Sequence, residues 1–209
     1  MQIDQFLTRW RHAGGSERAN YQLFIADLCD LLEVDRPQPA NQETRDNPYV
    51  FERRVVFHHG DGSTSNGFID CYKRGAFIGE AKKIRADAAT RKFDDAMLRA
   101  RGQAENYARH LSADEGRPPF LVVLDVGHVI ELYAEFTCTG GSYTPFPDPR
   151  SHRIRLDDLA RPEIRARLKA VWQDPHSLDP ARRTARATRD IAQKLARVAQ
   201  SLEGNYRPE

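Results

Sequence analysis

The fold is decided by the stretch FIDCYKRGAFIGEAK, residues 68–82, which predicts a β-hairpin. Its apolar flanks, Phe68-Ile69 and Phe77-Ile78, are typical of buried strands. Between them, Gly75 supplies the positive backbone φ that a short hairpin loop usually requires. The stretch therefore predicts two antiparallel strands that lie in the interior of the protein.

The same hairpin carries three charged residues, Asp70, Glu80 and Lys82. Because side chains alternate along a strand, Glu80 and Lys82 are expected on one face. With the turn centred on Arg74, Asp70 is expected opposite Ile78 and diagonal to Glu80, roughly 7–8 Å away. A divalent cation can bridge this gap, whereas two carboxylates in an apolar sheet otherwise repel unless one is protonated. The alternative interpretation is a solvated hairpin with a surface glutamate and lysine.

Size and composition bound the class of protein. The chain has 209 residues, 40% hydrophobic and 30% charged, which is enough for one domain of ordinary size and an appendage. No apolar run is long enough to span a bilayer and no signal-peptide pattern opens the chain, so no membrane partner is expected. The widely spaced Cys29, Cys71 and Cys138 fit neither a disulfide framework nor a zinc site and favour a reducing cytoplasm.

Two amphipathic helices are predicted near the N-terminus, the first ended by Gly14-Gly15 and the second capped by Ser16. Glu17 lies four residues before Tyr21, so it extends the buried stripe of the second helix at its first turn. This glutamate is either a favourable charge at a helix N-terminus or a residue aimed toward a metal site. The apolar positions that define the two helices are Ile3, Phe6, Leu7, Trp10, Tyr21, Phe24, Ile25, Leu28, Leu31 and Leu32.

The elements around the hairpin alternate between strands and helices. A strand is predicted over residues 49–59, before the hairpin, and a helix over residues 93–111, after it. The apolar run 120–126 predicts a strand buried on both faces, and residues 129–136 a partner strand beside it. This order predicts an α/β sheet core flanked by helices.

Two further helices are predicted at the C-terminal end, over residues 162–172 and 180–204. The last helix has an apolar face of strict four-three spacing that needs a partner helix or domain. Its basic face is interpreted either as a solvated surface or as a contact for phosphate groups. The basic residues are Arg182, Arg183, Arg186, Arg189, Lys194 and Arg197, and the apolar face is Thr184, Thr188, Ile191, Leu195, Val198 and Leu202.

Aspartate, nine residues and then Glu-x-Lys is the signature of the PD-(D/E)xK nuclease superfamily, which Asp70, Glu80 and Lys82 match. Further segments resemble the N-terminal nuclease region of MmeI-type single-chain restriction–modification enzymes. In that family a PD-(D/E)xK nuclease is fused, through a helical connector, to an adenine methyltransferase and a target-recognition domain. The segments that carry the resemblance are SERANY (residues 16–21), YVFER (49–53), the hairpin, the helical tail and QAENY (103–107), the last being similar to the Gln-x-x-x-Tyr element of RecB-like nucleases.

The resemblance implies a fold and a division of the chain. Residues 1–155 would form a restriction-endonuclease-like (PD-(D/E)xK) mixed sheet core flanked by helices. Residues 156–209 would form a helical connector toward a methyltransferase domain that this chain lacks. The chain is therefore expected to be a fragment or an excised domain of a longer polypeptide.

The resemblance also implies roles for individual residues of the hairpin and its surroundings. Asp70 and Glu80 would bind Mg²⁺, helped by the Ala81 carbonyl, and Glu17 would be an additional ligand. Lys82 would orient or activate the attacking water. These residues together would form the catalytic centre of a metal-dependent phosphodiesterase.

Residues of the following helix would assist that centre. Gln103 would position Lys82 or the DNA backbone, with Tyr107 packing beneath it, and Lys83 would lie among the DNA contacts. An ordinary helix–sheet contact is the alternative interpretation for Gln103 and Tyr107.

The sequence thus predicts a Mg²⁺-dependent endodeoxyribonuclease domain of a restriction–modification (phage defence) enzyme in the bacterial cytoplasm, acting on double-stranded DNA. Because no recognition-helix motif is present, specificity is expected from other domains. The resemblance implies that these are a target-recognition domain and an adenine methyltransferase, and that only the methyltransferase would need S-adenosylmethionine. One active centre cuts one strand, so double-strand cleavage implies a transient dimer on DNA. The alternatives are a non-catalytic nuclease-like DNA-binding or assembly module of a DNA methyltransferase, and a stand-alone nuclease of another defence system.

Overall fold

The computed structural model of the chain describes residues 1–11, 13, 17–84 and 88–205, and of residues 17–19 and 202–205 only the backbone. Its contacts divide the chain into two compact units, residues 1–175 and 176–209. The predicted boundary at residue 155 lies earlier in the chain, and residues 156–175 group with the first unit. The second unit holds the long helix α5 (Pro180–Asn205).

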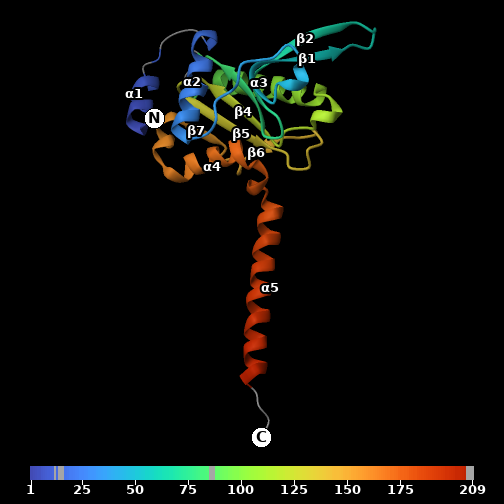
Figure 1. Ribbon diagram of the computed structural model, residues 1–209. Helices are drawn as coiled ribbons and strands as arrows, with labels where there is room; N and C mark the ends of the chain where they lie inside the picture. The colour runs from blue at the N-terminus through green and yellow to red at the C-terminus, as the bar shows by residue number, and fades with distance from the viewer. Residues whose placement is uncertain (12, 14–16, 85–87, 206–209) are drawn as a thin grey trace. The chain divides into compact units, whose positions relative to one another are not determined.

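The described residues of the first unit form one seven-stranded mixed sheet, which confirms the predicted α/β core (Figure 1). The strands are β1 (Tyr49–His58), β2 (Thr64–Lys73), β3 (Phe77–Lys82), β4 (Phe120–Asp125), β5 (Val129–Ala134), β6 (Thr144–Pro145) and β7 (Arg153–Arg155). They are ordered β1-β2-β3-β4-β5-β6, and β7 also pairs with β5. Among these described strands β3 and β4 are parallel and the other neighbours antiparallel. A parallel pair needs a crossover, which helix α3 (Arg91–His110) supplies.

Helices cover both faces of this sheet. Ile78 of β3 belongs to the main apolar cluster, in which it packs with residues of α3. Its neighbour Phe77 points to the opposite face, where its ring centroid lies 4.4 Å from that of Trp172. The remaining helices are α1 (Ile3–Arg11), α2 (Glu17–Leu32), α4 (Pro162–Gln173) and the 3-10 turns η1 (Thr44–Asp46), η2 (Ala113–Glu115), η3 (Leu156–Ala160) and η4 (Pro175–Leu178). No helix in the described ranges is both long and apolar enough to cross a membrane.

The predicted hairpin of β2 and β3 forms, but its register differs from the expected one. Ile78 pairs with Tyr72, because the loop is centred on Gly75, whose φ is +68°. The expectation that Asp70 lies opposite Ile78 is therefore wrong. The β2–β3 ladder ends at the pair of Cys71 and Gly79, and the next residues along the two strands are Asp70 and Glu80.

The ribbon of β1 and β2 extends past the rest of the sheet (Figure 1). The side chains of β1 change face along its length. Alternate residues of a regular strand share a face. In β1, however, Phe51 stacks edge-on against Tyr21 of α2, whereas Phe57 stacks on Tyr107 of α3. The reversal falls at Glu52, whose φ of +53° is in the left-handed region that non-glycine residues rarely adopt. The outer half of the ribbon is thereby turned toward α3.

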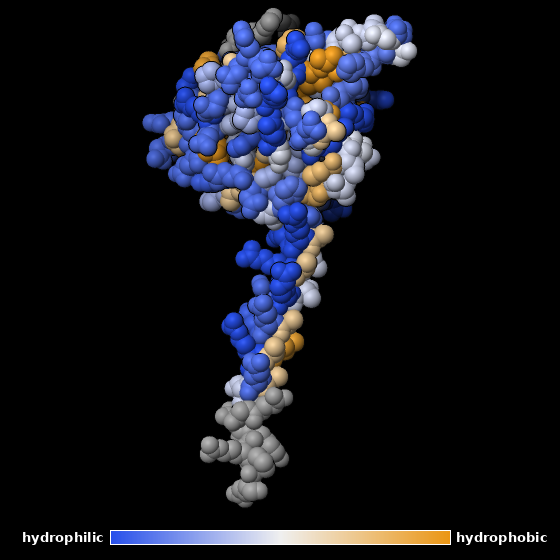
Figure 2. All heavy atoms as spheres, turned by 45° about the vertical axis from the view of Figure 1, so that its right-hand side comes forward, coloured by the Kyte–Doolittle hydropathy of each residue, from blue (hydrophilic) through white to orange (hydrophobic). Residues whose placement is uncertain are grey.

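Helix α5 confirms the predicted C-terminal helix and its amphipathic pattern. Ile191, Leu195 and Val198 lie along one face and are 60%, 65% and 56% exposed. Figure 2 shows hydrophobic residues along one side of this helix and hydrophilic residues along the other. A large exposed apolar stripe on a helix is typical of a surface that packs against another helix or domain.

Candidate active site

The candidate site lies where β2 separates from β3. In the described ladders β2 pairs with β1 from Thr64 to Lys73, but with β3 only from Cys71 to Lys73. Beyond that point β3 continues beside β4 as far as Lys82. The strands therefore separate at Asp70, and the end of β3 faces this side chain instead of a paired strand.

Asp70 replaces the missing strand contact with its own carboxylate. Its Oδ2 accepts a hydrogen bond of 2.7 Å from the backbone N–H of Ala81. Since the N–H and C=O of one strand residue point toward the same neighbour, the Ala81 carbonyl is directed to the same side. The partly buried Asp70 carboxylate is thus fixed beside the residue that separates Glu80 from Lys82.

Glu80 and Lys82 lie on the same face of β3 and are joined by an ion pair. Nζ of Lys82 donates to Oε1 of Glu80 at 2.6 Å. The glutamate side chain is 1% exposed and the lysine side chain 29%. A buried carboxylate is costly unless a counter-charge accompanies it, and Lys82 supplies one. The arrangement joins a partly exposed ammonium group to a buried carboxylate.

A third carboxylate, that of Glu52, lies on the other side of Asp70. The flanking pairs of the β1–β2 ladder place Glu52 directly across from Asp70. The hydroxyl of Tyr21 donates to Glu52 and accepts a hydrogen bond of 3.0 Å from Nε2 of Gln22. Burial, together with the carboxylates of Glu52 and Asp70, raises the pKa of Tyr21 well above its ordinary value. Tyr21 therefore remains a hydrogen-bond donor at neutral pH and holds Glu52 toward α2.

The sequence pattern around Glu52 indicates no role for this residue. It lies in the YVFER segment, but a left-handed backbone at a glutamate leaves no trace in composition or periodicity. The pairing of Glu52 with Asp70 also depends on the ribbon register, which only the folded structure gives.

A basic pocket of about 610 Å³ adjoins Lys82, between the end of β3 and α3. Its walls include three residues of the predicted site, Lys82, Lys83 and Gln103, together with Lys92 and Arg99, which the sequence analysis missed. Lys92, Arg99 and Gln103 are seven and four residues apart, so they lie on one face of α3. This spacing alone could have predicted from the sequence that the three side chains share a helix face. Ile84, Ala96 and Ala100 complete the lining.

Gln103 and Tyr107 are in contact, as their spacing of one helical turn predicts. Nε2 of Gln103 donates to the Tyr107 hydroxyl at 3.1 Å. The buried Tyr107 ring in turn stacks on Phe57 of the ribbon, with centroids 5.8 Å apart. Lys83 is held differently, because its Nζ donates to the backbone oxygen of Ala13 at 3.1 Å. The structure thus brings Gln103 and Lys83 to the pocket, while their roles stay predictions.

The oxygen donors of the site fit a hard divalent cation. Mg²⁺ in proteins commonly binds one or two carboxylates, with water and phosphate oxygens completing its coordination. Asp70 and Glu80 provide two carboxylates across adjacent strands, and no group of three or more His, Cys, Asp or Glu poised for a metal occurs in the described ranges. Glu17 opens α2, but its side chain lies outside the described residues, so its role as a ligand stays a prediction.

The fold and the site define a class of protein. A mixed sheet between helices, with two carboxylates and a lysine where two strands separate, is compatible with a restriction-endonuclease-like core. Comparison with family models is more specific, because the model described as the MmeI N-terminal domain matches residues 1–205. The chain therefore belongs to the MmeI N-terminal domain family, a region of restriction–modification enzymes. Comparisons with curated proteins and with solved structures find no match.

Proposed function

We propose that the chain is a Mg²⁺-dependent nuclease domain that hydrolyses phosphodiester bonds of double-stranded DNA. The observation that carries the proposal is the strand junction at which Asp70 accepts a hydrogen bond from the Ala81 N–H, between Glu80 and Lys82, which form an ion pair. A structural role alone does not require a buried carboxylate, a lysine paired with it and a second carboxylate on the neighbouring strand. The basic pocket next to Lys82 adds a surface of the charge that a DNA backbone needs.

Asp70 and Glu80 would hold the metal ion, with the Ala81 carbonyl as a further oxygen donor. When bound, Mg²⁺ supplies positive charge at the phosphate and makes an attacking water more acidic. Asp70 is preorganised for this role by its hydrogen bond with the Ala81 N–H. Glu80 is preorganised by burial, since few rotamers are open to a side chain that is 1% exposed.

Lys82 would act on the reacting phosphate and on the water that attacks it. Its ammonium group pairs with Glu80, and its side chain lines the basic pocket. A positive charge fixed beside the phosphate stabilises the negative charge that develops in the transition state. Lys92, Arg99 and Gln103 would contact backbone phosphates on either side of the scissile one.

The family also suggests which other domains and partners would act together with this nuclease domain. Sequence specificity and adenine methylation would come from methyltransferase and target-recognition domains in the same polypeptide, and S-adenosylmethionine would bind only there. Two copies would meet transiently on DNA to cut both strands. The enzyme would act in the bacterial cytoplasm as part of a restriction–modification system for phage defence.

Replacement of Lys82 tests the proposal. Lys82→Ala removes a charge beside the phosphate but keeps both carboxylates. The affinity for duplex DNA should therefore fall only by about the contribution of one phosphate contact. Cleavage of labelled duplex in Mg²⁺ should fall much further, by about 10²–10⁴-fold. Lys169→Ala, which removes a half-buried lysine paired with Glu33, is the matched control and should cut normally.

The outcome separates the proposal from its main alternative. Loss of cutting with retained binding supports a catalytic lysine. If wild type and Lys82→Ala bind equally and neither cuts, also within the full-length enzyme, the non-catalytic DNA-binding module is the better account.

Metal binding can be tested without any cleavage. Mg²⁺ should raise the melting temperature of the wild-type chain by mass action, and Asp70→Asn should remove this effect. Asp148→Asn, at an exposed aspartate of the loop before β7, should keep it. Equal stabilisation of wild type and Asp70→Asn in calorimetry would contradict the metal assignment.

A further inference from the structure

We propose that a second basic groove, formed by β1 and the C-terminal end of α3, binds backbone phosphates of duplex DNA away from the cutting site. This β1–α3 groove has a volume of about 610 Å³ and is separate from the pocket beside Lys82. Its basic lining is Arg45, Arg53, Arg54, His58, Arg109 and His110. The identification of the polymer as DNA rests on the proposed function. The existence of an anion site does not depend on it.

The charge of the groove favours a polyanion. Glu115 is the carboxylate in its lining, and that carboxylate is already engaged by Arg53 and, at 2.8 Å, by the hydroxyl of Tyr72. Three arginines beyond this pair, Arg45, Arg54 and Arg109, line the same groove and are exposed. Like charges gathered in one concave surface repel each other and raise the local concentration of anions.

Arg53 is a buried residue of the groove that several contacts hold in place. It is 3% exposed, its Nη1 donates to the backbone oxygen of Arg54 at 2.6 Å, and its Nη2 donates to Glu115. Its guanidinium also lies 5.4 Å from the centroid of the Tyr72 ring. A buried arginine held at three points keeps one orientation, and its charge is compensated by Glu115. The buried part of the groove is therefore preorganised, and its other arginines are exposed.

A continuous helix face connects this groove with the pocket beside Lys82. Lys92, Ala96, Arg99, Gln103, Tyr107 and His110 follow one another in α3 at spacings of three or four residues, which keeps them on one side of the helix.

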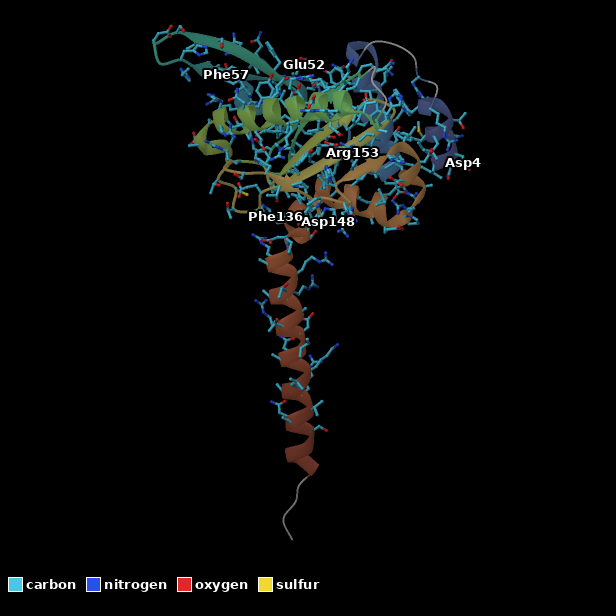
Figure 3. All side chains as sticks on the ribbon, turned by 180° about the vertical axis from the view of Figure 1, so that it is seen from behind. Asp4, Glu52, Phe57, Phe136, Asp148 and Arg153 are labelled. Atoms are coloured by element: carbon cyan, nitrogen blue, oxygen red, sulfur yellow. The ribbon has the colours of Figure 1, made fainter. Side chains whose placement is uncertain are left out.

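The same connection is made by direct contacts. Gln103 of the pocket donates to Tyr107, Tyr107 stacks on Phe57, and the Phe57 ring lies 4.8 Å from that of His110 in the groove. Figure 3 labels Phe57 on the ribbon, further along β1 than Glu52.

The separation of the two surfaces indicates a polymer as the ligand. Arg99 and His110 are eleven residues apart, so they are separated by about 16 Å along α3 at a rise of about 1.5 Å per residue. A DNA strand advances about 3.4 Å per nucleotide, so the two surfaces span about five nucleotides. A single nucleotide or free phosphate cannot reach both, whereas one backbone can run from the cutting site into the β1–α3 groove.

A salt series measures the phosphate contacts directly. The double variant Arg54→Gln/Arg109→Gln removes two exposed groove arginines and keeps Arg53. Binding of a fluorescently labelled duplex is followed in EDTA, so that no cleavage occurs. The slope of log affinity against log salt should become shallower by roughly two units, about 0.9 for each lost contact.

Matched variants make the result specific to the groove. Arg150→Gln/Arg161→Gln removes the same charge from exposed arginines elsewhere in the first unit and should leave the slope close to wild type. Arg54→Lys/Arg109→Lys keeps the charge and should restore most of the slope. Melting curves check folding, and if the double glutamine variant is unfolded, the single variant Arg54→Gln should show about half the change.

Three outcomes would overturn the proposal. The first is an equal slope change in the groove variant and the Arg150/Arg161 control, and the second is no measurable duplex binding by the wild-type chain at low salt. The third is that the groove variant loses polyglutamate binding but keeps duplex binding, which would assign the groove to an acidic protein. Because the assay contains no metal, failure of Lys82→Ala to abolish cleavage would leave these results unchanged.

Discussion

Tyr21 of α2 donates a hydrogen bond to Glu52 of β1, the residue whose left-handed backbone reverses the faces of the ribbon. A left-handed conformation costs a non-glycine residue about 1–2 kcal/mol, so surrounding contacts must hold it in place. The Tyr21 hydroxyl and the edge-on stacking of its ring on Phe51 provide such contacts. Because Glu52 lies across from Asp70, this backbone strain occurs beside the candidate metal site.

Glycine at position 52 should relieve the strain. Glu52→Gly and Glu52→Ala both lose the carboxylate and the Tyr21 hydrogen bond, and only glycine adopts a φ of +53° without a steric cost. Glu52→Gly should therefore be more stable than Glu52→Ala by about 1 kcal/mol in urea unfolding. At Ser65, an exposed residue of β2, the order should reverse, with alanine the more stable of the two. The same order at both positions would contradict a strained backbone at Glu52.

Gly67 leaves room for the ring stack that connects the ribbon with α3. A Cβ at this position would lie 2.5 Å from Cε2 of Phe57 and 2.6 Å from Cε1 of Tyr107. Gly67→Ala should therefore destabilise the protein by about 1–3 kcal/mol, because the rings must move. Gly60→Ala, at a glycine with nothing within 4 Å of the new Cβ, should be close to neutral in the same denaturation assay. Equal effects of the two substitutions would mean that the stack is not tightly packed.

Glu135 should make stability depend on pH in the acid range. Burial raises the pKa of its carboxyl, but hydrogen bonds from Thr137, Gly140 and Thr139 outweigh burial and hold the pKa below its ordinary value. A carboxyl whose pKa is lowered on folding stabilises the protein above its unfolded value of about 4.3. That stabilisation is lost as the pH falls through the lower, folded value.

The pH dependence can be measured by urea unfolding on either side of this window. Glu135→Gln should lose stability relative to wild type above about pH 5, and the difference should shrink as the pH falls below about 4. Glu43→Gln, at an exposed glutamate, is the control and should show little difference at either pH. A constant difference between Glu135→Gln and wild type would show that the ionised form is not what stabilises the loop.

The apolar stripe of α5 should serve association and not the stability of the first unit. Changing Ile191, Leu195 and Val198 to serine should weaken binding to the proposed methyltransferase domain or to a second copy, measured by sedimentation. The melting transition of the first unit should stay unchanged. The control on the polar side of the helix is the triple serine variant of Gln193, Arg197 and Gln200. A lower melting temperature for the stripe variant alone would mean that this face packs on the first unit.

Much of the fold could be predicted because its signals are local. The periodicity of Phe93, Met97 and Ala100 indicates α3, and the run 120–126 indicates the buried strand β4. Glu80 and Lys82 share a face because strand alternation alone decides it. These features depend on neighbours within a few positions in the sequence.

The features that the sequence did not predict depend on residues distant in the chain. The register of β2 against β3 depends on a loop centred on Gly75 and not on Arg74, and both residues fit a turn. The β1–α3 groove combines residues of η1, β1, α3 and η2 that no local pattern joins. The position of Glu52 beside Asp70 depends on the change of side-chain face along β1. A pattern of alternating hydrophobic residues does not predict such a change.

Helix α3 fixes an angle as well as a distance, because its residues rotate by about 100° at each step. An insertion of one residue between Gln103 and Tyr107 would turn Arg109 and His110 away from β1 while leaving Lys92 and Arg99 beside Lys82. An insertion of a full turn, close to four residues, would keep the angle but move the far contacts by about 6 Å, nearly two nucleotides. Homologous chains with insertions in this helix should therefore have them in near-whole turns. If the proposed function holds, the length of DNA bound beyond the cleavage site should change in the same steps.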